Sequence, residues 1–179
     1  LEGSHGLMLT EVPSVIGGVV GIHILCTGFT LVKGSVLLEN GGWLGQGQFS
    51  GCEILQLKKL NDPTSLELLK ACTPPGGLIT TEFLRGLLTL HKLTSGTVDT
   101  VTVIEPDVGT LLTTITMGEG CPFGFVLKIT GKVAVQDTAV GTSQVTHLFT
   151  EFAPLTRLFI NGKEPKVTFD GSVNITLAE

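Results

Sequence analysis

Apolar and polar side chains alternate along residues 125–135, FVLKITGKVAV, and the fold is inferred starting from this run. A period of two is that of a β-strand with one buried face. Gly131 lies within the run, where a glycine indicates a bulge, a bend or a close approach by another backbone segment. The side chains expected on the buried face are those of Phe125, Leu127, Ile129, Val133 and Val135.

Further strands are predicted on both sides of this run, from β-branched or alternating segments bounded by turn residues. Asn40-Gly41-Gly42 and Asn161-Gly162 are predicted turns, because Asn and Gly tolerate positive φ. A loop is expected at residues 137–141, and the final run, residues 167–177, is either one long bulged strand or a hairpin that turns at Asp170-Gly171. The other expected strands are residues 12–20, 21–32, 36–38, 43–51, 52–60, 98–104, 110–117, 144–152 and 158–160.

Residues 62–93 predict two short helices instead. Asp62 suits the N-cap of the first helix and Pro63 its first turn. The second helix is expected at residues 81–93, although Gly86 within it lowers the stability of a helix by about 1 kcal/mol relative to alanine. We expect the pair to cover one open end or face of the β structure. The face of the second helix would carry Phe83, Leu84, Leu87, Leu88 and His91.

Together these elements predict a mainly β fold, an antiparallel β-sandwich or barrel with a short helical insert at about residues 62–93. The pattern does not choose between sandwich and barrel. Residues 1–7 are interpreted as a cloning scar, LEGSHG, and the start of the chain, with Met8 as the native start. Residues 8–179 are then a single β-rich domain.

The chain is poor in charge, which limits how its surface can be covered. It is 42% hydrophobic and 15% charged, against an ordinary charged share of about 25%. Either the surface is rich in Thr, Ser, Gly and Gln, or a large apolar area is buried against other subunits. The formal net charge of -5 argues against nucleic-acid binding, which needs clustered Lys and Arg.

Residues 12–32 carry no formally charged side chain and approach the length of a membrane-spanning helix. However, Pro13 and several glycines interrupt the run, and His23 lies near its middle. We therefore expect buried strands here and no membrane span.

The four cysteines, Cys26, Cys52, Cys72 and Cys121, match no zinc-ligand spacing. Buried free thiols are expected, and disulfides are the alternative. Four cysteines allow three pairings, among which the sequence does not choose.

No catalytic, cofactor-binding or metal-binding constellation is recognised in the chain. Glu105-Pro106-Asp107 is interpreted as a solvated turn that ends a strand. One enzymatic alternative stays open, a site assembled from distant residues. It would combine Cys121 or Cys52 with His147 or His23.

The features together predict a non-enzymatic structural subunit that assembles with copies of itself, as in a shell, tube or coat. The alternative is a barrel or sandwich that binds a small apolar ligand. Its cavity would be lined by Phe125, Leu127, Phe149 and Trp43. The residues expected at a self-association interface, each of which could instead belong to the core, are Val12, Val15, Ile16, Val19, Phe83, Leu87 and Leu90.

Overall fold

The computed structural model describes residues 2–3, 12–13, 19–20, 22–32, 36–38, 42–58, 65–92, 96–122, 124, 126–141, 144–149, 155–162 and 171–176. Regular structure in these residues is β-strand, apart from two 3-10 helices of three residues each, η1 (Lys70–Cys72) and η2 (Pro75–Gly77). All strand pairs are antiparallel. The mainly β, antiparallel fold predicted from the alternation is thus confirmed.

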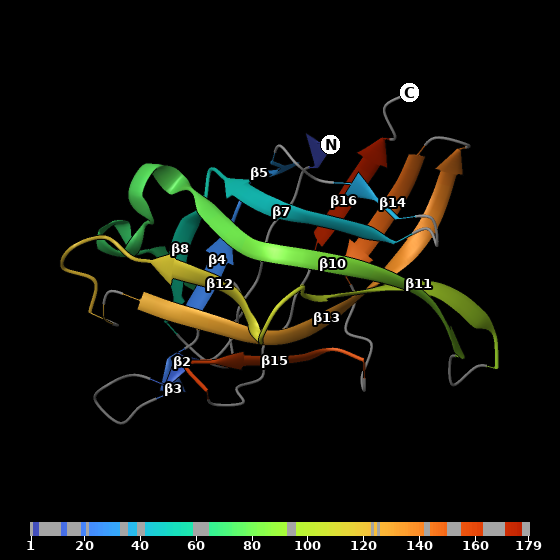
Figure 1. Ribbon diagram of the computed structural model, residues 1–179. Coiled ribbons are helices and arrows are strands. Elements are labelled where there is room, and N and C mark those ends of the chain that lie inside the picture. Colours follow the sequence, from blue (N-terminus) through green and yellow to red (C-terminus); the bar gives the residue numbers. More distant parts are fainter. Residues whose placement is uncertain are drawn as a thin grey trace.

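Eleven strands form the largest sheet, which Figure 1 shows in the foreground. Its main path runs through β1 (Glu2–Gly3), β5 (Gly28–Leu31), β7 (Trp43–Ser50), β10 (Ile79–Lys92), β11 (Val98–Pro106), β13 (Val126–Gly141), β14 (Gln144–Phe149) and β16 (Gly171–Thr176). Three more strands join at its sides: β6 (Val36–Leu37) on β7, β12 (Leu111–Thr116) between β10 and β13, and β15 (Arg157–Ile160) on β13. The first and last strands of the path, β1 and β16, lie beside each other, so the sheet curls back towards its beginning.

Two smaller sheets complete the described structure. One contains β4 (Ile22–Leu25), β8 (Glu53–Leu57) and β9 (Leu66–Leu68), and the other contains β2 (Val12–Pro13) and β3 (Val19–Val20). The β1 residues Glu2 and Gly3, within the segment interpreted as a cloning scar, pair with Thr30 and Phe29.

The sheets pack against each other as in a β-sandwich, with one hydrophobic core between them. Burying each large aliphatic side chain contributes about 1.5–3 kcal/mol. Six of these side chains, from β4, β8, β12, β13 and β15, are almost completely inaccessible to solvent: Ile22, Ile24, Ile54, Ile115, Leu127 and Ile160.

The alternation predicted for the long central strand is present in β13. Leu127, Ile129, Val133 and Val135 are buried, whereas Val126 and Lys128 are exposed. Ala134, on the other face, is buried as well. Phe125 lies outside the described residues. The strand also continues to Gly141 through pairing with β14, so the loop expected at residues 137–141 is wrong.

Gly131 allows β13 to bend and change partners on both sides. Residues up to Thr130 pair with β12, and residues from Val133 pair with β11. On the opposite edge, β15 pairs with residues 129–132 and β14 takes over at Gln136. The φ of Gly131 is 112°, and a Cβ here would collide with the carbonyl oxygen of Arg157. A strand that passes from one layer to another in this way needs a bulge or bend at the corner.

The second predicted helix is wrong, because residues 79–92 form strand β10. Backbone pairing on both edges, with β7 and β11, overrides the helical spacing of the leucines. Gly86 has a different role from the one a helix would give it. It lies opposite Trp43 in register, and a Cβ at this position would collide with the indole ring. The glycine therefore makes room for the tryptophan.

The first predicted helix is wrong as well over its described part. Leu66–Leu68 is strand β9, which pairs with β8, and only the 3-10 helix η1 follows. Residues 59–64, with the expected N-cap, lie outside the described residues. The amide of Leu69 donates to the carbonyl of Ile54, so the hydrogen bonds of this segment go to a neighbouring strand.

Of the predicted turns, Asn161-Gly162 is confirmed, with φ values of 50° and 74°. Strands β6 and β7 form the hairpin expected around Asn40-Gly41-Gly42, although residues 39–41 lie outside the described residues. Residues 167–170 also lie outside the described residues. The two predictions for the final run, one long bulged strand or a hairpin that turns at Asp170-Gly171, therefore both stay open.

All four cysteines form disulfides, so the expectation of free thiols is wrong. Cys26 follows β4 and bonds to Cys52, which precedes the neighbouring strand β8. Cys72, at the end of η1, bonds to Cys121 beyond β12. The paired cysteines are 26 and 49 residues apart in sequence, and only the tertiary structure brings them together.

We predict that Gly131→Ala lowers the free energy of unfolding by more than about 3 kcal/mol, because backbone strain adds to a collision with Arg157. The control is Gly162→Ala, where φ is also positive but no atom lies within 4 Å. It should cost about 1–2 kcal/mol. Urea unfolding of both variants measures the difference, and equal losses would contradict the collision.

We predict that removing either disulfide costs about 3–4 kcal/mol, because the cross-links close loops of 26 and 49 residues in the unfolded chain. The double variants Cys26→Ala/Cys52→Ala and Cys72→Ala/Cys121→Ala can be compared with the oxidised protein by denaturant unfolding. If all three unfold at the same denaturant concentration, the prediction is wrong.

Candidate functional site

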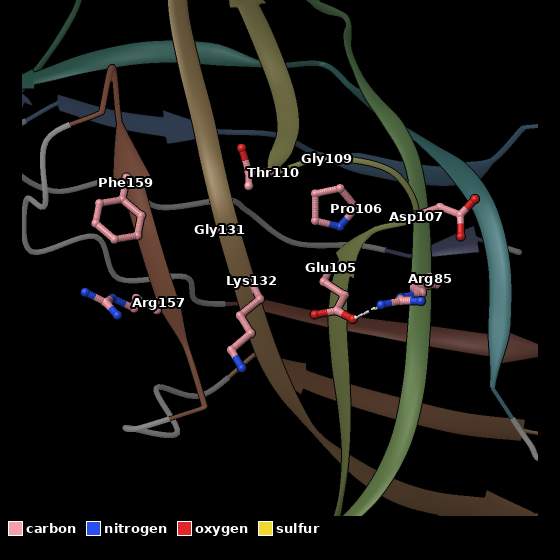
Figure 2. A pocket seen from close by; sticks show the side chains of 10 residues that line it. All are labelled: Arg85, Glu105, Pro106, Asp107, Gly109, Thr110, Gly131, Lys132, Arg157 and Phe159. Carbon is pink, nitrogen blue, oxygen red and sulfur yellow. Dashed lines mark hydrogen bonds and ion pairs between the residues drawn. The ribbon is translucent and has the colours of Figure 1, made fainter.

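A charged groove with a volume of about 330 Å³ lies beside the bend of β13 (Figure 2). Strands β10, β11, β13 and β15 and the turn before β12 contribute its walls. The lining residues are Arg85, Glu105, Pro106, Asp107, Gly109, Thr110, Gly131, Lys132, Arg157 and Phe159.

The groove exists because β13 changes partners. The β11 ladder ends at Ile104–Val133, and the β12 ladder begins at Leu111–Thr130. Between them the chain turns through residues 107–110, and the amide of Gly131 donates to the carbonyl of Thr110 over 2.9 Å. The strands therefore separate at Gly131 and Lys132, and the space between them is the groove.

Charged side chains cross the groove in a row from four adjacent strands. Arg85 and Glu105 are opposite in register, and the guanidinium donates to Oε1 of Glu105 from Nη2 over 2.6 Å and from Nε over 2.9 Å. Lys132 and Arg157 are also directly opposite each other, on β13 and β15. The guanidinium carbon of Arg157 lies 5.2 Å from the ring centroid of Phe159. Figure 2 shows Lys132 between Glu105 and Arg157 in this row.

The groove was not predicted from the sequence. Glu105 was interpreted as part of a solvated turn, but it lies in β11 and forms an ion pair. The one available signal was the mid-strand Gly131, which indicated a bend. Which basic residues would meet there depends on strand pairing, which the sequence does not give.

A second candidate surface is a projecting β-hairpin, called here the arm: residues 87–92 of β10 and 98–100 of β11. The pairing of β10 with β7 ends at Gly86–Trp43, and that of β11 with β13 ends at Val101–Gln136. The two arm strands continue to pair with each other as far as Lys92–Val98. In Figure 1 the arm extends away from the rest of the sheet at the right.

One face of the arm carries exposed apolar side chains. Register places Leu88, Leu90 and Val98 on the same face, and they are 49%, 73% and 57% exposed. The side chain of Leu84, earlier on the same face, is buried in the core. The face that covers the core thus continues into solvent along the arm.

The residues predicted at an interface do not form one surface, because some lie on opposite faces of β10 and others in different segments. Phe83 is exposed and Leu87 partly buried, and the strand alternation of β10 places both on the face opposite Leu90. Val12 and Val19 belong to the pair β2–β3. Val15 and Ile16 lie outside the described residues. Among the predicted interface residues that the structure describes, Leu90 alone lies on the apolar face of the arm.

The structure describes part of each of the two alternative sites. Cys52 and Cys121 are disulfide-bonded and hold no thiol for catalysis. Leu127 and Trp43 pack in the core rather than against the groove. The side chains of Phe125 and Phe149, also expected in an apolar cavity, are not among those described.

His23, in β4, is a buried histidine, 8% exposed, and its Nε2 has no hydrogen-bond partner among the described residues. Burial lowers the pKa of this imidazole from its ordinary value of 6.5, because the charged form loses its hydration. His91 and His147 lie on other strands, β10 and β14.

Among the residues that the structure describes, no group of three or more His, Cys, Asp or Glu side chains could hold a metal ion. None of the helices in the described part of the chain has the length and apolarity needed to cross a membrane. Comparison of the chain with protein-family models, curated proteins and solved structures gave no significant match.

We predict that the protein loses stability as the pH falls below about 6.5. The unfolded chain then protonates His23 while the folded chain, with its lowered pKa, does not. The free energy of unfolding should fall by up to about 1.4 kcal/mol per pH unit, until the folded pKa is reached. His23→Leu should remove this loss and the control His91→Gln should keep it, as measured by urea unfolding between pH 5 and 7.5. An identical pH profile for the wild type and His23→Leu would contradict the assignment.

Proposed function

We propose that the protein is a non-enzymatic structural subunit that associates with copies of itself, and that the arm is the contact surface. The observation that carries the proposal is the apolar face of the arm, on which Leu88, Leu90 and Val98 are about half to three-quarters exposed.

Such an arm gains stability when a second surface covers it. An isolated two-stranded hairpin is only marginally stable in water. Burying apolar surface contributes roughly 25 cal/mol per Å², and pairing of exposed strand edges adds main-chain hydrogen bonds.

A second copy of the chain suits this surface because a two-fold contact needs only one patch that is complementary to itself. On this face Leu90 is in register with the uncharged Thr100, and Lys92 is the charged residue in register with Val98. Two such faces can approach each other without bringing many like charges together. The low charged share of the chain, 15%, also favours surface buried between subunits.

The two disulfides indicate the redox environment in which such an assembly would be stable. Cytosolic thiols are kept reduced, so structural disulfides favour an oxidising environment. An assembly exposed to such conditions benefits from subunits whose folded state is cross-linked.

The proposal predicts a mass larger than the 18.8 kDa of one chain, measured by light scattering on a sizing column at several concentrations. Leu90→Glu should shift the protein towards the monomer, because it places a charge on the face to be buried. The control is Val108→Glu, which adds the same charge at an exposed apolar residue outside the arm and should leave the mass unchanged.

A monomer at every concentration would overturn the proposal. Native mass spectrometry of the purified protein would then test the alternative function, binding of a small apolar ligand. Equal effects of Leu90→Glu and Val108→Glu would place the association surface elsewhere than the arm.

A further inference from the structure

We infer that strand β9 is a second contact surface, at which it pairs edge to edge with β9 of another copy of the chain. A two-fold contact closes after two copies, so a shell, tube or coat needs a second contact besides the arm. In this respect the inference rests on the proposed function. The contact itself is argued from β9, which lies in a different sheet from the arm.

The unpaired edge of β9 is defined by the hydrogen bonds of this segment to β8. The amide of Leu69 donates to the carbonyl of Ile54 over 2.8 Å. Alternate residues of an antiparallel strand direct both backbone groups to the same side, so Glu67 also faces β8. Leu66 and Leu68 therefore direct their amides and carbonyls away from β8. Among the described strands, none pairs with this outer edge.

The side chains beside this edge are apolar and exposed. Leu68 is opposite Leu55 in register, and Ile54, the residue before Leu55, is buried in the core. Leu66 and Leu68 therefore lie on the face that points away from the core, and they are 40% and 37% exposed. An unpaired strand edge with exposed apolar side chains is a template for a further strand.

A second β9 suits this edge because the edge is complementary to itself. When two copies pair antiparallel about a two-fold axis at Glu67, Leu66 of each copy lies opposite Leu68 of the other. The outward-facing amides and carbonyls of both leucines then all find partners across the axis. The same register brings each exposed leucine beside a leucine of the other copy, so the apolar side chains cover one another.

The charges at this contact balance. Glu67 of one copy would lie opposite Glu67 of the other, and like charges in this position weaken a pair of strands. However, each Glu67 is bound by Lys58 of its own copy, with 2.9 Å between Nζ and Oε2. The contact therefore joins two ion pairs without net charge rather than two bare carboxylates.

Light scattering on a sizing column tests the contact. Leu68→Glu places a charge on the paired edge and should reduce the wild-type assembly to the dimer held by the arm. Leu90→Glu should leave the dimer held by β9, and the double variant Leu68→Glu/Leu90→Glu should be the 18.8 kDa monomer. The control is Leu25→Glu, which adds the same charge at an exposed leucine of the same sheet, but on β4 at the opposite edge. It should keep the wild-type mass.

Hydrogen exchange of single amides gives a second readout. The amide of Leu66 should be protected in the wild-type assembly and exchange rapidly in Leu68→Glu, because its partner belongs to the other copy. The amide of Leu69 is the internal control. It bonds to Ile54 within the same chain and should be protected in both proteins.

The inference is overturned if Leu68→Glu has the mass of the wild type, or if the amide of Leu66 exchanges rapidly in the wild-type assembly. It is also overturned if Leu25→Glu lowers the mass as much as Leu68→Glu does, since packing through the whole sheet face would then replace edge pairing. A mass that depends on Leu68 but not on Leu90 would retain the β9 contact and remove the arm. The reverse dependence would retain the arm and remove the β9 contact.

Discussion

The backbone at Gly131 is the constraint on which most of this structure depends. Strand β13 can pair with β12 and β15 in its first half and with β11 and β14 in its second half only if it bends between them. The bend requires a positive φ and brings the carbonyl of Arg157 to the place where a side chain would begin. A single residue without a Cβ therefore allows one long strand to join the layers that enclose the core.

Glycines also leave space for aromatic rings that pack on the sheet. Gly86 lies under the indole of Trp43, and Gly47 lies under the ring of Phe29. Glycine weakens a strand when it stands alone, but here the ring covers the backbone and fills the space that a side chain would need. The two disulfides then fix the segments around η1 and η2, which have little regular structure of their own.

Both candidate surfaces follow from unequal strand lengths around this bend. Because β10 and β11 are longer than their ladders with β7 and β13, their distal ends project as the arm with an apolar face. Because β11 leaves β13 before β12 joins it, the charged groove opens beside Lys132. The arm and the charged groove are therefore two consequences of the same strand exchange, at different ends of the same pair of strands.

Side-chain period and local backbone preference were enough to predict the mainly β class, the alternation of β13, the turn at Asn161-Gly162 and the importance of Gly131. They did not determine that residues 79–92 form a strand. Their leucine spacing fits a helix equally well, and pairing on both edges decides the outcome. The disulfides, the groove and the arm could not be predicted in this way, because each depends on which distant segments become neighbours in the folded chain and on where strand pairing stops.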